Sequence, residues 1–200
     1  MEGLALYVYA QRKIEPTLGD AKFLTTTIGI KLADCAADKG STTYFYIYKG
    51  AEKQADQCVG EMGVSKVFVM LGVNDLGVGY SVNETIVNYN RTIEKLYQAA
   101  PGIEITILLN TPRNASSWLP SYIPNTEFGN PLIDEFVEAV KIMCAERNLP
   151  YVDLSTALKG ENGALPEEYC GDGFDHLTYA GAAVIVATLR DYAKEVLSRQ

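Results

Sequence analysis

The stretch KVFVML at residues 66–71, followed at once by GVND at residues 72–75, decides which fold class to expect. A short, near-continuous apolar run is typical of a central parallel strand that is buried on both faces. The polar GVND segment then ends the strand. Ligands of open α/β sheets bind beyond the carboxyl ends of the strands, so residues 72–75 are a candidate site segment.

Strand-like and helix-like segments alternate on both sides of this stretch, which predicts an α/β domain with a parallel sheet. Further strands are expected at 22–27, 103–109 and 151–154, with an extra strand or hairpin arm at 42–48. Helices are expected at 4–12, 53–62 and 84–99, the last capped by Asn83, and after Asn130-Pro131 and Thr178. With 200 residues and no internal repeat or linker, the chain fits a single domain over residues 1–200.

The composition excludes several classes of partner. The formal net charge is −8, so nucleic acid and anionic membrane surfaces would repel the chain. No apolar run approaches the roughly 20 residues of a membrane span. Residues 1–13 lack the features of a signal peptide, which leaves the compartment undefined.

No sequence pattern indicates a cofactor or a metal. No GxGxxG motif or P-loop follows an early strand, which argues against a nucleotide-binding Rossmann or flavodoxin-like domain. The four cysteines contain no C-x-x-C pair, so a zinc site is not expected. Buried free thiols are favoured over disulfides; the cysteines are Cys35, Cys58, Cys144 and Cys170.

Asn74 is the first candidate site residue. Its side-chain amide would lie at the mouth of a site beyond the strand, where it could donate a hydrogen bond to a developing oxyanion. The preceding Gly72 would let backbone or substrate approach closely. The alternative is a tight turn in which Asn74 and Asp75 bond their own backbone.

His176 is the second candidate, and it is the only histidine in the chain. A histidine that acts as a general base needs a group that holds its tautomer and stabilises the imidazolium. Asp172, four residues earlier across a glycine turn, can fold back to reach the ring. Asp175 is adjacent in sequence and ranks second, because neighbouring side chains usually diverge. The alternative is a structural histidine with solvated carboxylates.

The GVND segment, together with Asp172 and His176 near the C-terminus, resembles blocks of the SGNH hydrolase superfamily of GDSL-like esterases and lipases. The resemblance implies a three-layer α/β/α sandwich with a flavodoxin-like parallel sheet. It also implies ester hydrolysis by a Ser-His-Asp mechanism, with His176 as base, Asp172 as its partner, and Gly29 and Asn74 as oxyanion donors. Asn74 and His176 should then converge at the C-terminal rim of the sheet. One departure is the spacing D-x-x-x-H, since the more usual D-x-x-H would place the acid at Gly173.

A second departure concerns the nucleophile. The opening MEGLALY (residues 1–7) resembles the continuation that follows the family's G-D-S block, so the serine and the first strand are expected upstream of Met1. Gly19-Asp20-Ala21 is rejected as a substitute because it follows the first helix, and none of the serines present is expected on a strand-to-helix turn of the required kind. This chain would then be inactive or nearly so. A sheet without its first strand could pair with residues 43–48 or with a partner chain, which would give a homo-oligomer.

The expected substrates are small carboxylic esters, such as acyl or acetyl esters of sugars or lipids. The competing hypothesis is a non-catalytic module that binds a carbohydrate or a peptide. The aromatic loop 110–130 could wall an acyl or sugar pocket. It could equally pack on its own aromatic rings.

Overall fold

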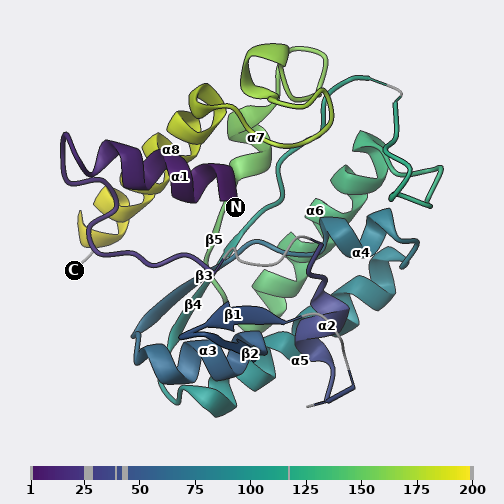
Figure 1. The fold of residues 1–200 in the computed structure, drawn as a ribbon. Helices are drawn as coiled ribbons and strands as arrows, with labels where there is room; N and C mark the ends of the chain where they lie inside the picture. The colour runs from purple at the N-terminus through teal and green to yellow at the C-terminus, as the bar shows by residue number, and fades with distance from the viewer. Residues whose placement is uncertain (1, 25–28, 39, 42–44, 117, 199–200) are drawn as a thin grey trace. The chain divides into compact units, whose positions relative to one another are not determined.

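The computed structural model describes residues 2–24, 29–38, 40–41, 45–116 and 118–198 (Figure 1). The chain forms two compact units. Unit 1 comprises residues 1–25, 111–119 and 152–200, and unit 2 comprises residues 26–110 and 120–151. The expectation of one domain over residues 1–200 stays a prediction.

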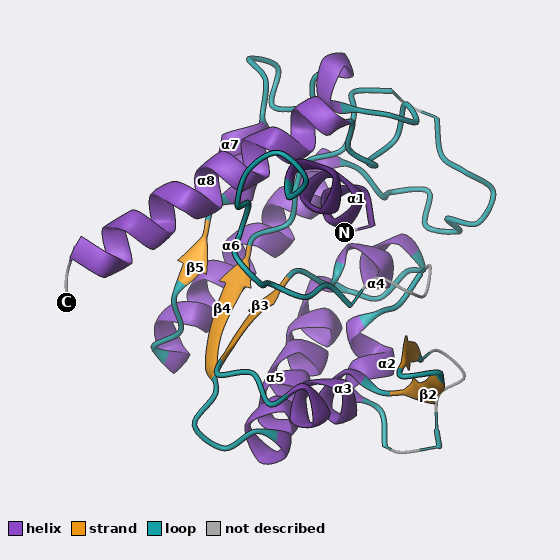
Figure 2. Ribbon diagram, turned by 60° about the vertical axis from the view of Figure 1, so that its left-hand side comes forward, coloured by secondary structure: helices purple, strands orange, loops and turns teal. Residues whose placement is uncertain are grey.

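A parallel sheet organises unit 2 (Figure 2). Strand β3 (Lys66–Val69) pairs in parallel with β4 (Glu104–Leu108), with Lys66 opposite Glu104. The strand order is β3-β4-β5, where β5 is the short strand Tyr151–Val152. The predicted α/β class with a parallel sheet is therefore confirmed.

Burial along the sheet differs from the expectation in one respect. On β4 every residue after Glu104 is buried, as predicted for a strand covered on both faces. On β3, however, Phe68 is 43% exposed. In the described residues β3 is the terminal strand of the sheet, so its side chains have a neighbouring strand on one side only.

Five helices of unit 2 are described: α2 (Leu32–Ala36), α3 (Ala55–Met62), α4 (Val73–Gly77), α5 (Val82–Ala99) and α6 (Asn130–Arg147). Helix α5 begins after Ser81, not Asn83. The Ser81 hydroxyl accepts the N–H of Glu84 (3.2 Å), while the Glu84 carboxylate accepts the N–H of Ser81 (2.9 Å). This reciprocal capping box outcompetes Asn83, which lies inside the first turn. Helix α6 buries the predicted stripe of Ile133, Phe136, Val137, Val140 and Cys144.

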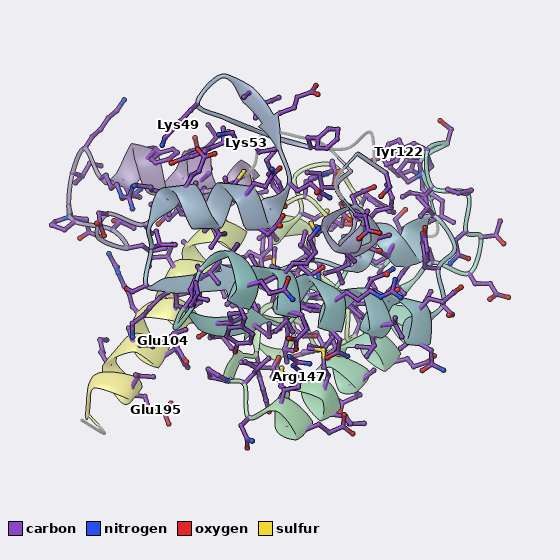
Figure 3. The ribbon with its side chains drawn as sticks, turned by 90° about the horizontal axis from the view of Figure 1, so that it is seen from below. Lys49, Lys53, Glu104, Tyr122, Arg147 and Glu195 are labelled. Carbon is purple, nitrogen blue, oxygen red and sulfur yellow. The ribbon has the colours of Figure 1, made fainter. Side chains whose placement is uncertain are left out.

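A hairpin of β1 (Tyr46–Tyr48) and β2 (Ala51–Lys53) confirms the predicted arm for the part that is described. Residues 42–44 lie outside the described residues. Lys49 and Gly50 form the two-residue turn with φ values of +52° and +75°, as a type I′ hairpin requires. Lys49 and Lys53 (Figure 3) both pair with Glu61 of α3. In the described residues β1 pairs with β2 and does not extend the parallel sheet.

The predicted strand at 22–27 is not supported where it can be tested. Residues 22–24 form no strand, and residues 25–28 lie outside the described residues.

The four cysteines are free thiols, of which Cys35, Cys58 and Cys144 are buried and Cys170 is partly exposed.

Unit 1 is mainly helical. Its helices are α1 (Glu2–Gln11), α7 (Leu154–Leu158) and α8 (Tyr179–Ser198), with a short 3₁₀ helix, η1, at Glu167–Tyr169. Helix α8 packs against α1 and α7 and buries Ala182 and Ile185. Thr178 caps α8 as predicted, because its hydroxyl accepts the N–H of Gly181 at 3.3 Å. None of the described helices is long and apolar enough to cross a membrane.

Candidate active site

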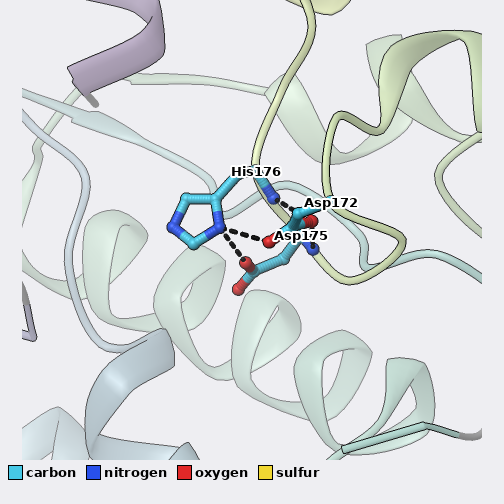
Figure 4. Close-up of side chains that lie close together, drawn as sticks. All are labelled: Asp172, Asp175 and His176. Atoms are coloured by element: carbon cyan, nitrogen blue, oxygen red, sulfur yellow. Dashed lines mark hydrogen bonds and ion pairs between the residues drawn. The ribbon is translucent and has the colours of Figure 1, made fainter. Parts of the chain in front are cut away.

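The loop of residues 172–178 in unit 1 is shaped around the Asp172 carboxylate. Its Oδ1 accepts the backbone N–H groups of Phe174 (2.8 Å), Asp175 (3.1 Å) and His176 (3.2 Å). Gly173 has φ +72°, a left-handed conformation that lets the chain fold back in this tight turn. Oδ2 of the same carboxylate then lies 2.5 Å from Nδ1 of His176 (Figure 4).

The electrostatics of this pair favour one arrangement of protons. Partial burial acts to raise the pKa of Asp172, but the hydrogen bonds from His176 and from the backbone outweigh burial and hold the pKa at about 2. A carboxylate that stays ionised accepts the proton on Nδ1, which leaves the lone pair of the neutral ring on Nε2. The His176 side chain is 70% exposed, and Nε2 has no partner among the described residues. The imidazole is thus oriented and open to a reactant.

Asp175 lies further from the ring, with its Oδ1 3.4 Å from Nδ1 of His176. Burial raises the pKa of Asp175, while the charges of His176 and Arg113 oppose that shift. Asp172 is therefore the stronger partner of the imidazole by distance and by charge.

The three side chains could also share a metal ion, since one ligand atom of each lies within 4.8 Å of the others. No metal is expected from the sequence.

The GVND segment in unit 2 turns from β3 into helix α4. Gly72 has φ +111°, and a Cβ added there would lie 2.4 Å from Cζ of Phe136. Only glycine fits this turn. Asn74 is exposed in the first turn of α4, and its Nδ2 donates to the Ile30 carbonyl at 2.9 Å. This bond reaches across 44 residues and differs from the local turn that was the alternative.

The same bond brings Asn74 to the segment that contains Gly29. Gly29 is exposed, has φ +80° and directly precedes Ile30. An amide nitrogen carries two hydrogens, and the second hydrogen of Asn74 Nδ2 has no partner among the described residues. Unit 2 therefore brings together the two residues that were expected to donate to an oxyanion.

Asp75 is a residue whose role the sequence did not reveal. Its carboxylate is 0% exposed and accepts the backbone N–H groups of Leu32 (2.7 Å) and Ala33 (2.9 Å) at the start of α2. Burial raises its pKa to about 6, against the opposing effect of these two hydrogen bonds. The sequence did contain one indication that α2 needs an acceptor from elsewhere. Lys31 precedes α2, and a lysine side chain has no acceptor with which to cap a helix.

Loop 110–130 runs through both units, and its unit 1 part packs on the candidate loop. The Arg113 guanidinium lies 4.5 Å from the centroid of the Phe174 ring and donates to the Trp118 carbonyl at 2.7 Å. Trp118 meets Phe174 edge to face and is 55% exposed. In the unit 2 part, Phe128 is buried and Tyr122 is exposed. Packing on aromatic rings is therefore present, while a ligand-binding role for Trp118 stays a prediction.

One serine, Ser155, lies close to a strand-to-helix turn. It is in the first turn of α7, three residues after β5 ends. It is 2% exposed, however, which removes its hydroxyl from any substrate in solution. Asp153 begins this turn and caps α7 by accepting the N–H of Thr156 at 2.8 Å.

The candidate site thus consists of two described halves. Asp172 and His176 belong to unit 1, and Gly29 and Asn74 belong to unit 2. The convergence of the two halves on one substrate stays a prediction.

Comparisons with known proteins identify relatives of the chain. The model of the GDSL-like Lipase/Acylhydrolase family matches residues 34–184. A solved Streptococcus pneumonia protein, provisionally assigned as a platelet activating factor, has a TM-score of 0.57 and 27% identity over 64% of this chain and 59% of that chain. A GDSL-like lipase from Bacteroides thetaiotaomicron has a TM-score of 0.55 and 19% identity over 66% of this chain and 63% of that chain.

A third solved structure covers more of the chain. A carbohydrate esterase of family 3 from Talaromyces cellulolyticus has a TM-score of 0.58 and 16% identity over 86% of this chain and 70% of that chain. At this identity the likeness concerns the fold. The chain spans less than two thirds of the Streptococcus and Bacteroides proteins. No curated protein matches it.

Proposed function

This chain belongs to the GDSL-like lipase/acylhydrolase family, and on that premise we propose that it serves the hydrolysis of small carboxylic esters with His176 as general base. The family assignment agrees with the resemblance to SGNH hydrolases. The observation that carries the proposal is the 2.5 Å contact between His176 Nδ1 and Asp172 Oδ2, with Nε2 left open to a reactant.

The proposed mechanism gives each of the four candidate residues a role. Nε2 of His176 takes the proton of a serine hydroxyl while the serine oxygen attacks the ester carbonyl. The ionised Asp172 stabilises the imidazolium that forms. The N–H of Gly29 and the second N–H of Asn74 stabilise the negative charge on the carbonyl oxygen. The imidazolium then protonates the leaving alcohol, and water hydrolyses the acyl-enzyme by the same steps.

The nucleophile and the substrate are the parts of the proposal that need experiment. The family resemblance leads us to expect the serine upstream of Met1, and Ser155 is buried. For the substrate, which is the acyl donor, we propose acyl or acetyl esters of sugars or lipids, a class that includes the carbohydrate esters indicated by the name of the carbohydrate esterase neighbour.

The test is hydrolysis of p-nitrophenyl acetate by this chain and by the product of its gene translated from the natural start. We expect activity in the gene product and little or none in the 200-residue chain. His176→Ala should lower kcat roughly 10²- to 10⁴-fold in the gene product. A fluorophosphonate probe followed by peptide mass spectrometry would identify the serine.

Two outcomes would count against this proposal. Robust hydrolysis by the 200-residue chain that His176→Ala abolishes would reveal a different nucleophile within it. Binding of an acetylated sugar by the gene product without any turnover would favour a non-catalytic binding module.

A further inference from the structure

At the start of helix α2, the Asp34 carboxylate accepts the N–H of Lys31 at 2.9 Å, but the N–H groups of Leu32 and Ala33 have no acceptor from α2 itself. The first N–H groups of a helix have no partner within the helix and need an acceptor from outside. Lys31, at the N-cap position, offers only donors. The acceptor comes from α4, where Asp75 bonds the N–H groups of Leu32 and Ala33 from 43 and 42 residues away.

Asn74 and Asp75 together attach one backbone segment to α4. Asn74 donates to the Ile30 carbonyl at 2.9 Å, and Asp75 accepts from Leu32 at 2.7 Å and from Ala33 at 2.9 Å. Three hydrogen bonds therefore fix the backbone at residues 30–33. Gly29 directly precedes this segment.

The charged and titratable groups that act on Asp75, or on which it acts, are Lys31, Asp34 and Cys35. Asp34 of α2 and the N-cap residue Lys31 are its charged neighbours, and they pair with each other at 3.0 Å. The Cys35 thiol also faces it, and burial, together with the charges of Asp34 and Asp75, raises the pKa of Cys35 to about 12. Burial raises the pKa of Asp75 itself to about 6.

We propose that Asp75 is a positioning residue whose ionised carboxylate holds Gly29 and Asn74 in register as oxyanion donors. Hydrogen bonds to an ionised acceptor are roughly twice as strong as neutral ones. A proton on the carboxylate therefore weakens the attachment of residues 30–33. The placement of the segment stands on the geometry alone, and only its consequence for catalysis rests on the proposed function.

The first test follows the backbone amides of Leu32 and Ala33 by NMR in the 200-residue chain, from about pH 4.5 to about pH 7.5. Both signals should move with one shared midpoint near pH 6, because both N–H groups bond the same carboxylate. The Gly29 amide and the Asn74 side-chain amide should move with the same midpoint. Signals that do not respond in this range would overturn the proposal.

The second test compares Asp75→Asn with Asp38→Asn, which removes an equal charge from an exposed position after α2. An asparagine replaces one of the two carboxylate oxygens with an NH₂ donor, so the arrangement in which each oxygen accepts one N–H group is lost, together with the charge. The midpoint should disappear in Asp75→Asn and persist in Asp38→Asn. The Gly29 and Asn74 signals should shift in the first variant only, and unchanged signals in Asp75→Asn would contradict a positioning role.

The third test measures kinetics in the gene product. Oxyanion donors act on the transition state, so misplacing them should lower kcat by about 10-fold or more and leave KM within about twofold. Asp38→Asn should match the unmodified protein. An equal kcat in Asp75→Asn would overturn the catalytic consequence. If no variant hydrolyses any ester, the proposed function fails, and the NMR tests still decide the positioning role.

Discussion

The two oxygens of the Asp172 carboxylate make different contacts within one loop, and this distinguishes Asp172 from its neighbour Asp175. One oxygen of Asp172 fixes three backbone N–H groups, and the other lies 2.5 Å from the His176 ring. Asp175 makes only the longer contact of 3.4 Å with that ring. The two carboxylates in this loop therefore differ in their expected roles, and substitution can distinguish them.

Asp172→Asn should lower kcat for ester hydrolysis by roughly 10³- to 10⁴-fold, because the amide no longer holds the required tautomer. Asp175→Asn should lower kcat by less than about 10-fold, since Asp172 remains in place. Steady-state kinetics of both variants in the gene product would measure this difference. Equal losses in the two variants would show that the carboxylates act as one unit.

Asp75 predicts a pH dependence of stability with a definite sign. Its pKa is raised to about 6 in the folded protein from an ordinary value of 3.8. The folded state therefore binds more protons than the unfolded state between these values. The free energy of unfolding should fall as pH rises through this window, by about 3 kcal/mol in total. Ionisation strengthens the two hydrogen bonds but desolvates a charge, and the desolvation is the larger effect.

The measurement is urea denaturation of the unmodified protein and of Asp75→Asn from about pH 4 to about pH 7. The difference between the two unfolding free energies should vary with pH in this window. Asp172 has its pKa lowered to about 2, so its contribution is present above pH 3.8 and is lost only in stronger acid. A difference that is constant with pH would contradict the raised pKa of Asp75.

At the scale of elements, the junction between β3 and α4 depends on Gly72. An added Cβ at Gly72 would meet Phe136 of α6 at 2.4 Å, on a backbone with φ +111°. Gly79 has a similar φ of +101° but no neighbouring atom within 4 Å of its added Cβ. The two glycines therefore share the backbone strain and differ only in the steric contact.

Gly72→Ala should destabilise the protein by about 2–4 kcal/mol, as backbone strain and overpacking add. Gly79→Ala should cost only about 1–2 kcal/mol, from the backbone alone. Chemical denaturation of both variants measures the two losses. Equal losses would show that Phe136 moves aside without cost.

The sequence predicted elements well where the signal was local. The apolar runs at 66–71 and 103–109 became β3 and β4, and the stripe of α6 was correct. The cap of α5 was wrong by two residues, because the Ser81–Glu84 pair competes with Asn83 for the helix start. Local patterns thus fix where elements lie more reliably than where they begin.

Candidate residues were predicted by chemical type and spacing, as with Asn74 and His176. Asp75 was missed because its partners lie 42 and 43 residues away and are backbone groups, which carry no signature in the sequence. The exposure of Phe68 was also missed, since it depends on which strand lies at the end of the sheet. Long-range pairing is the information that local patterns lack.

At the scale of the whole molecule, the path of the chain through the two units affects how cooperatively the protein unfolds. The chain passes from one compact unit to the other after residues 25, 110, 119 and 151. Neither unit is built from one continuous segment. Folding of either unit therefore requires the chain to run through the other unit. If the chain is a single domain, as expected, it should unfold in one cooperative transition.

The chain offers a direct probe of this expectation, because Trp118 is its only tryptophan and lies in unit 1. Trp118 fluorescence and far-UV circular dichroism should give the same denaturation midpoint. Gly72→Ala, whose strain lies in unit 2, should shift the Trp118 transition by the full loss of stability that circular dichroism records. A Trp118 transition that ignores Gly72→Ala would mean that the units unfold independently.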